Sequence, residues 1–187
     1  MEALRHKYYT YKDYAEWEID ERYELIDGIV YMMSAPSPIH QIIILEMAVQ
    51  LSAFIEGSPC RVYISPFDVR LNPDSGDDTV VQPDIFIVCD RTKIDAKGCN
   101  GAPDMIIEVL SPSSEKMDKD IKLKKYQDAG VCEYWLIEPD GETVLVYNLT
   151  QDGSYDSGTT HRDAGVITTR GGCAVDMKRV FDKSRIE

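Results

Sequence analysis

The sequence has few of the residues that build zinc sites or disulfide frameworks. It contains three histidines and five cysteines, and no two cysteines form a C-x-x-C pair. Because such frameworks need clustered ligands, we expect no zinc site and reduced cysteines. The chain also lacks an apolar run long enough to span a membrane, and the segment from Met1 to Asp20 lacks the apolar core of a signal peptide. These absences predict a cytoplasmic protein that does not contact a membrane.

Basic residues are also scarce. The chain has 20 Lys and Arg against 33 Asp and Glu, which gives a formal net charge of −13. Tight non-specific nucleic-acid binders usually carry a basic surface, so this charge argues against strong unassisted binding to DNA. It does not exclude an acidic metal site, because a bound ion brings its own positive charge. The length of 187 residues and the apolar fraction of 43% predict a single domain, residues 1–187, with a substantial core.

The pattern of apolar residues and turn formers predicts a mixed α/β chain. Asp27-Gly28 between two apolar runs is typical of a β-hairpin. Apolar spacing, caps and stop signals predict helices at 10–20, 39–55 and 114–129, with a short terminal helix at 176–181. Further strands are expected at 61–69, 80–89, 105–110, 133–137 and 143–148, and a loop at 95–102.

Glu108 is the most informative residue. It is the only charge in the apolar run from Met105 to Leu110, and in a strand it faces the same side as Ile106. Burying a carboxylate there costs several kcal/mol unless the group is paired or bound to a metal. A structural ion pair with a lysine is the alternative. Asp84, on what we expect to be an adjacent strand, can lie beside Glu108, although a turn residue at a strand edge explains Asp84 equally well.

Three further side chains could complete this site. Lys122 lies on the following helix in one stripe with Asp118 and Tyr126, because four-residue steps stay on one helical face. A solvated ion pair is the alternative for Lys122. Glu24 could supply a third carboxylate, although a lone exposed strand residue is the favoured interpretation. His40 could reach the sheet edge, or simply occupy the first turn of its helix.

Several short motifs, each weak alone, occur in a specific order. They are Tyr23-Glu-Leu-Ile-Asp-Gly28, Gln82-Pro-Asp84, Ile107-Glu-Val-Leu-Ser-Pro-Ser113, Asp118…Lys122…Tyr126 and Glu133-Tyr-Trp-Leu136. Together, over roughly 8–148, they resemble the family labelled Uma-two within the PD-(D/E)XK nuclease superfamily. The resemblance implies a restriction-endonuclease-like fold, an α/β fold with a mixed central β-sheet flanked by α-helices, and metal-dependent phosphodiester hydrolysis.

The resemblance also assigns roles to individual residues. Asp84 and Glu108 match the two acidic positions of the superfamily, and Glu24 matches an additional N-terminal acidic residue. The lysine expected two residues after Glu108 is replaced by Leu110. Lys122 matches a substitute lysine on the following helix. The implied catalytic set is therefore Asp84, Glu108, Lys122 and Glu24.

The chemistry of these residue types fits a magnesium site. Mg²⁺, or Mn²⁺ in its place, would be held by Asp84, Glu108 and the main-chain carbonyl of Val109. Mg²⁺ prefers oxygen ligands and uses one or two carboxylates, which leaves positions for water and a phosphate oxygen. Lys122 would orient the attacking water or stabilise the developing negative charge.

The leading prediction is a Mg²⁺-dependent endonuclease, a hydrolase whose partner is nucleic acid, with DNA favoured over RNA. A homodimer would let one modest domain address two strands. The net charge and the leucine at position 110 favour, as an alternative, a nuclease-like fold kept as a non-catalytic binding or assembly module. A phosphoesterase acting on small nucleotides is a third interpretation, which suits an acidic protein better than duplex DNA does.

Overall fold

The computed structural model describes residues 3–4, 7–17, 21–162 and 165–185. Six strands form a central sheet: β4 (Arg61–Ile64), β7 (Ile85–Val88), β10 (Met105–Val109), β11 (Glu133–Glu138), β12 (Thr143–Asn148) and β13 (Thr159–Arg162). Their order is β13-β12-β11-β10-β7-β4; β10 and β11 run parallel and the other neighbours antiparallel. The predicted mixed sheet is therefore confirmed.

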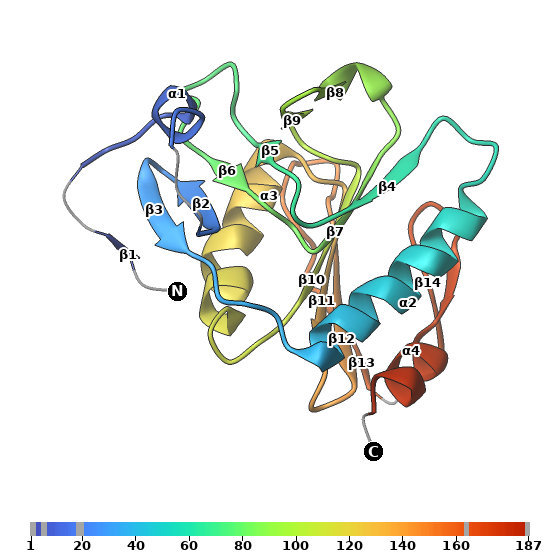
Figure 1. Ribbon diagram of the computed structural model, residues 1–187. Helices are drawn as coiled ribbons and strands as arrows, with labels where there is room; N and C mark the ends of the chain where they lie inside the picture. The colour runs from blue at the N-terminus through green and yellow to red at the C-terminus, as the bar shows by residue number, and fades with distance from the viewer. Residues whose placement is uncertain (1–2, 5–6, 18–20, 163–164, 186–187) are drawn as a thin grey trace.

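One face of the central sheet packs against α2 (Pro38–Phe54) and α4 (Met177–Ser184) (Figure 1). α2 begins after Ser37, whose hydroxyl accepts a hydrogen bond of 3.2 Å from the main-chain N–H of His40. The odd-numbered apolar residues of β7, β10 and β11 point towards these helices and share one core with them. The long helix predicted at 39–55 is confirmed, and its first turn lies at one end of the sheet.

The opposite face packs against η2 (Met117–Lys122), which is π-helical, and α3 (Leu123–Ala129), which continues from it. α3 ends at Gly130, whose φ of 89° is the left-handed conformation that glycine adopts at no steric cost. The even-numbered apolar residues of β7, β10 and β11 form the second core together with Tyr126. Glu108 lies on this face, as its spacing predicted, so its carboxylate enters the layer between sheet and helix.

Seven short strands form a second sheet: β1 (Ala3–Leu4), β2 (Tyr23–Ile26), β3 (Ile29–Met32), β5 (Val69–Arg70), β6 (Val80–Val81), β8 (Ile94–Asp95) and β9 (Gly98–Asn100). Apolar residues of β2, β5 and β6 pack into the core that holds α3. The β2–β3 hairpin is confirmed, and its turn residues Asp27 and Gly28 have φ values of 51° and 72°, as a type I′ turn requires.

The remaining elements are α1 (Tyr11–Tyr14), η1 (Arg91–Lys93), β14 (Val166–Thr168) and β15 (Ala174–Asp176). α1 is shorter than the predicted helix at 10–20, of which residues 18–20 lie outside the described part. Among the described residues, no helix is long and apolar enough to cross a membrane.

Three predicted segments differ from the structure because strand pairing is not local. The strand expected at 61–69 divides into β4 and β5, which belong to different sheets on either side of the cis peptide bond between Ser65 and Pro66. The strand expected at 80–89 divides in the same way into β6 and β7. The loop expected at 95–102 is instead partly β-sheet, because β8 pairs with β9 and β9 pairs with β5.

The expectation that all cysteines are reduced is wrong for two of them. Cys60 precedes β4 and Cys89 follows β7, and the two form a disulfide. The antiparallel register that pairs Arg61 with Val88 places these cysteines opposite each other. Their sequence separation of 29 residues gave no sign of this pairing. The free cysteines are Cys99, Cys132 and Cys173.

Candidate active site

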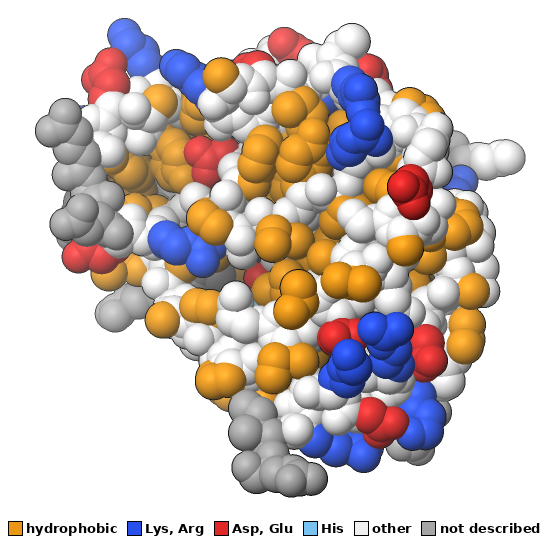
Figure 2. All heavy atoms as spheres, turned by 45° about the vertical axis from the view of Figure 1, so that its right-hand side comes forward, with side chains coloured by type: hydrophobic (Ala, Val, Ile, Leu, Met, Phe, Trp, Pro, Cys, Tyr) orange, Lys and Arg blue, Asp and Glu red, His pale blue; other side chains and the backbone are white. Residues whose placement is uncertain are grey.

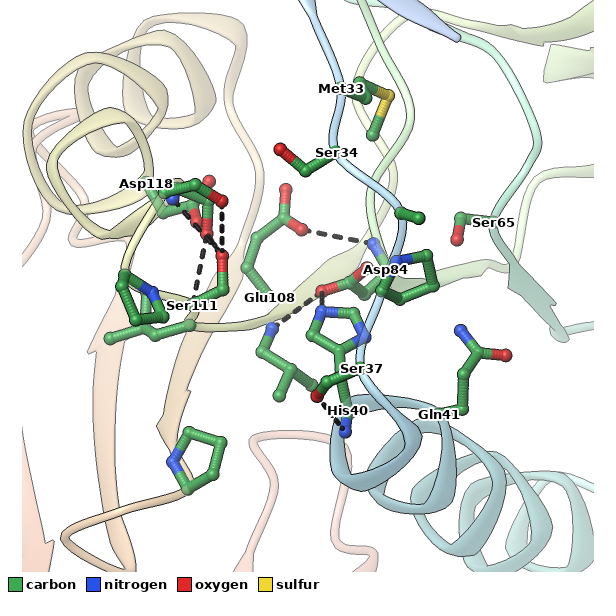
Figure 3. A pocket seen from close by; sticks show the side chains of 18 of the residues that line it. Met33, Ser34, Ser37, His40, Gln41, Ser65, Asp84, Glu108, Ser111 and Asp118 are labelled. Atoms are coloured by element: carbon green, nitrogen blue, oxygen red, sulfur yellow. Dashed lines mark hydrogen bonds and ion pairs between the residues drawn. The ribbon is translucent and has the colours of Figure 1, made fainter. Parts of the chain in front are cut away.

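A cavity of about 250 Å³ opens at the end of the central sheet where β7 begins and β10 ends. Its walls come from the segment between β3 and α2, the first turn of α2, the loop after β10 and the start of η2. Figure 3 shows Asp84 and Glu108 near each other in this cavity, with His40 reaching in from α2 and Asp118 on the opposite side. The cavity therefore collects polar side chains that are far apart in the sequence.

Asp84 and Glu108 are fixed by reciprocal hydrogen bonds. The antiparallel register that pairs Ile85 with Ile107 brings Asp84 opposite Glu108. Glu108 Oε2 accepts a hydrogen bond of 3.1 Å from the main-chain N–H of Asp84, and Asp84 Oδ2 accepts one of 2.8 Å from the main-chain N–H of Val109. Within the described part of the chain, Asp84 Oδ1 has no hydrogen-bond partner. The pair is thus rigid and keeps one carboxylate oxygen available.

His40 contacts Asp84 directly. It therefore reaches the sheet edge, which was one of the two positions that the sequence allowed. Its Nε2 lies 3.1 Å from Asp84 Oδ2. Burial alone would lower the pKa of His40, but the hydrogen bond to Asp84, its charge, and the main-chain carbonyl of Val109 raise the pKa above its ordinary value. His40 therefore holds the Asp84 carboxylate from the side of α2.

Lys122 reaches the carboxylates from the opposite side. Its Nζ lies 3.0 Å from Glu108 Oε1, 2.9 Å from Glu24 Oε1 and 3.4 Å from Asp118 Oδ1. The side chain is almost fully buried, with 2% of the residue exposed. Burial alone would lower the pKa of Lys122, but the surrounding carboxylates raise it well above its ordinary value. The solvated ion pair considered for Lys122 is therefore wrong.

Glu24 and Tyr126 complete the contacts around these groups. Glu24 is fully buried, so its interpretation as an exposed strand residue is wrong. Its Oε1 accepts a hydrogen bond of 2.9 Å from the main-chain N–H of Gln82 in addition to contacting Lys122. The Tyr126 hydroxyl donates a hydrogen bond of 2.7 Å to Glu108 Oε1. Glu24 thus ties the second sheet to the lysine, and Tyr126 ties α3 to the carboxylate.

The site carries more negative than positive charge. Three carboxylates, those of Glu24, Glu108 and Asp118, surround the ammonium of Lys122, and a fourth, that of Asp84, lies beside Glu108. Burial, with the neighbouring carboxylates adding to it, raises the pKa of Glu108 well above its usual range, and burial likewise raises the pKa of Asp118. Glu24 Oε2 and Asp118 Oδ1 are buried and have no hydrogen-bond partner within the described residues. Such a site is stabilised by an additional cation.

The donor set fits a hard divalent ion held by few protein ligands. Asp84, Glu108 and Val109 line the cavity, and their carboxylate and main-chain carbonyl groups are oxygen donors. Across the described ranges, no three His, Cys, Asp or Glu side chains are arranged to enclose a metal ion. Mg²⁺ suits this situation, because it keeps several waters and is commonly bound through one or two carboxylates.

Sequence reasoning missed two charged residues that line the same cavity, Arg22 and Asp140. The available signal for Arg22 was its spacing, because Arg22 lies two residues before Glu24 and residues two apart point to the same face of an extended strand.

Comparisons with known proteins identify the family and the fold of this chain. Residues 11–170 match the Uma2 family, described as "Putative restriction endonuclease". An uncharacterized protein of Synechocystis sp. is 24% identical over 147 residues, covering 77% of this chain and 76% of its own length. A crystal structure of a "putative nuclease" from Anabaena variabilis has a TM-score of 0.77 at 20% identity, covering 95% of this chain and 99% of that one. The predicted restriction-endonuclease-like α/β fold is confirmed by this likeness.

Proposed function

Because this chain belongs to the Uma2 family, we propose from its site that it is a metal-dependent endonuclease that hydrolyses DNA phosphodiester bonds. The observation that carries this proposal is the pair formed by the half-buried Asp84 and the buried Glu108, which are hydrogen-bonded to each other's strand, with one buried lysine beside Glu108. Such an arrangement costs free energy in the absence of further positive charge, and enzymes commonly retain such sites for chemistry.

The ion best suited to the site is Mg²⁺, with Mn²⁺ as a substitute, held by Asp84, Glu108 and the main-chain carbonyl of Val109. When bound, such an ion polarises a phosphoryl oxygen and lowers the pKa of an attacking water. The chain supplies the orientation. The hydrogen bond from the N–H of Val109 and the contact with His40 fix the Asp84 carboxylate, and the N–H of Asp84 fixes Glu108.

Lys122 is the cation placed at the reacting phosphate. Its ammonium lies beside Glu108, where it can donate to a phosphate oxygen or to the attacking water as negative charge develops. Glu24 sets the position of that ammonium from the second sheet. In this proposal Asp84, Glu108, Lys122 and Glu24 form the catalytic set, while Tyr126 and His40 position the carboxylates.

The test compares metal binding and cleavage in wild type, Glu108→Gln and Glu133→Gln. Glu133 is the matched control, because it is also a buried strand carboxylate, but it bonds to Trp135 and to the main-chain N–H of Arg170. Mg²⁺ and Mn²⁺ are titrated by calorimetry, and each protein is then incubated with plasmid and with single-stranded DNA. We expect the binding heat and the cleavage to vanish together in Glu108→Gln and to persist in Glu133→Gln.

Other outcomes separate the alternatives. A folded wild type that binds no metal would mean that the acidic cluster is structural and that the fold serves as a binding or assembly module. Metal binding with cleavage of dinucleotides, but not of plasmid or single strands, would establish a phosphoesterase for small nucleotides. The cavity volume of about 250 Å³ and the net charge of −13 favour that third function over binding of duplex DNA alone.

We also expect a cytoplasmic homodimer that favours DNA over RNA. Apolar side chains spread across the face formed by α2 and β4 (Figure 2). The large exposed ones there are Leu45, Val49, Phe54 and Ile64, which expose 58%, 49%, 50% and 46% of their surface. α2 is thus apolar on its outer side as well as its inner side, and a helix that is apolar all round normally has both sides covered. A second copy of this chain would cover the outer side.

A further inference from the structure

Arg22 is a basic residue of the cavity that has no role in the catalytic proposal. It immediately precedes β2 and is half-buried, and it lines the cavity together with Asp84 and Glu108. Glu24, two residues later, points into the layer that holds Lys122. The two-residue spacing puts Arg22 on the same face of the strand, which explains how both side chains reach one site.

One edge of the Arg22 guanidinium is held by Gln82. Arg22 Nε and Nη2 donate hydrogen bonds of 3.1 Å and 2.9 Å to Gln82 Oε1. Within the described part of the chain, Nη1 has no hydrogen-bond partner and the guanidinium forms no ion pair. The free edge, which carries Nη1 and the second hydrogen of Nη2, can still donate two parallel hydrogen bonds.

The orientation of Gln82 is set by groups behind it. Gln82 Nε2 donates hydrogen bonds of 2.9 Å to Asp68 Oδ1 and 3.2 Å to the Tyr14 hydroxyl. The Tyr14 hydroxyl donates a hydrogen bond of 3.0 Å to the same Asp68 oxygen. Because the amide nitrogen must face the Asp68 carboxylate, the amide oxygen faces Arg22. α1 therefore has a structural purpose, since it supplies the Tyr14 that closes this chain of hydrogen bonds.

The charge of Arg22 is notable in its surroundings. The cavity is lined by the carboxylates of Asp84, Glu108, Asp118 and Asp140, yet none of them lies within ion-pairing distance of the guanidinium. Lys122, in contrast, lies within ion-pairing distance of three carboxylates. An arginine held by a neutral amide, with one edge free, suits an incoming anion with paired oxygens, and phosphate has that geometry.

We propose that Arg22 binds a phosphate group of the substrate next to the one that is cleaved, and that Gln82 positions it through Asp68 and Tyr14. This inference rests on the proposed function, because it needs a substrate with adjacent phosphates. Lys122 lies at the carboxylate pair and serves the reacting phosphate, whereas Arg22 is held apart from that pair by Gln82. Arg22 therefore contacts the substrate equally in the bound state and in the transition state. Such a contact raises the affinity for substrate and leaves the rate of the chemical step unchanged.

The test uses Arg22→Gln, Arg22→Lys, Gln82→Met and the control Arg61→Gln. Arg61 is exposed and lies on β4 at the end of the sheet away from the cavity. Among the described residues, its side chain bonds only to the main-chain carbonyls of Ser58 and Cys60, which are near it in sequence. Binding of a fluorescein-labelled single-stranded oligonucleotide is followed by anisotropy in EDTA at several NaCl concentrations. The kinetic constants for cleavage of the same oligonucleotide are measured with Mg²⁺.

In Arg22→Gln we expect KM to rise about ten- to hundredfold with kcat retained, as expected when a charged hydrogen-bond donor is lost. The salt dependence of binding should become shallower by about 0.7 in the log–log slope, because one contact with a single-strand phosphate is lost. Arg22→Lys should restore the slope but not the affinity, since lysine keeps the charge and loses the planar fork. Gln82→Met should raise KM and keep the slope, while Arg61→Gln should change neither.

The outcomes distinguish this inference from the proposed function. Cleavage with the same KM and the same slope in Arg22→Gln and wild type would overturn the role of Arg22 and leave the nuclease intact. Binding that depends on Arg22 without any cleavage would support the phosphate contact and overturn the nuclease. If wild type neither binds nor cleaves the oligonucleotide, both proposals are wrong.

Discussion

The buried lysine of the site makes a measurable prediction about stability. Replacing Lys122 by methionine keeps an unbranched side chain of similar length but removes the ammonium. Nζ has three carboxylate partners at 2.9, 3.0 and 3.4 Å, and each partner is itself at least 97% buried. Removing one member of a buried charge cluster leaves the others uncompensated, which costs about 3–5 kcal/mol.

The assay is unfolding by urea and by heat, in EDTA so that no metal ion replaces the lost charge. Trp135 is fully buried in the central sheet, so its fluorescence reports the loss of the core. For a chain of this size about 1 kcal/mol corresponds to roughly 2–4 °C, so Lys122→Met should lower Tm by roughly 6–20 °C. Adding Glu24→Gln should recover part of the loss, because it removes one of the unpaired carboxylates.

The matched control is Lys124→Met on the same helix. The Lys124 side chain is 69% exposed and pairs with Asp128 at 3.1 Å, and a surface pair of this kind contributes about 0–1 kcal/mol. If Lys122→Met and Lys124→Met lower the free energy of unfolding equally, the reasoning about a buried charge cluster is refuted. The same conclusion would follow if Glu24→Gln made Lys122→Met less stable.

Three further predictions concern other parts of the molecule. Reduction should lower the free energy of unfolding by about 3–4 kcal/mol, since the Cys60–Cys89 disulfide closes a loop with a separation of 29 residues; a paired serine variant should not respond to reductant. A hydrogen bond from Lys183 holds the pKa of Glu46 below its ordinary value of 4.5, so this carboxylate stabilises the fold above that pH and the contribution is lost as the pH falls below it. Glu46→Gln should therefore give a shallower loss of stability in acid urea titrations, and an unchanged slope would contradict the assignment. Sedimentation equilibrium should show a dimer for wild type and a monomer for Leu45→Lys, whereas a wild-type monomer would refute the pairing through α2.

Local signals predicted part of this fold correctly. The turn at Asp27-Gly28 needs positive φ at two successive residues, and only a few residue types tolerate that conformation. The period of two in β10 placed Glu108 on the same face as Ile106, because side chains alternate along a strand. In both cases the determining interactions lie within a few residues, so the sequence alone carries them.

Features that depend on pairing between distant segments could not be predicted from the sequence. The run at 61–69 has strand propensity throughout, but its two halves pair with different partners, β7 and β6. The same pairing brings Cys60 to Cys89. Nothing in the composition of a strand specifies which neighbour it will take, so neither the division of the run nor the disulfide could be derived locally.

The candidate site could be predicted from the sequence only in part. Asp84 and Glu108 could be paired from the sequence because each begins or interrupts an apolar strand. The burial of Glu24 could not be predicted from the sequence. It results from the packing of the second sheet against α3, and the hairpin that contains Glu24 shows no local sign of that contact. The role of Arg22 was not predicted, because its partner Gln82 is 60 residues away in sequence.

The lysine of the site lies in a segment of unusual helical geometry. Leu110 is 6% exposed and belongs to the apolar core under η2 and α3, so this position brings no ammonium to the site. The ammonium must arrive from the helix instead.

In this helix the main-chain N–H of Leu123 donates a hydrogen bond to the carbonyl of Asp118, five residues earlier, which is the π-helical bond. This wider turn is uncommon and is found frequently at functional sites. Here it coincides with the segment that presents both Asp118 and Lys122 to Glu108. The rare backbone geometry and the rare buried ammonium thus occur in the same segment of the chain.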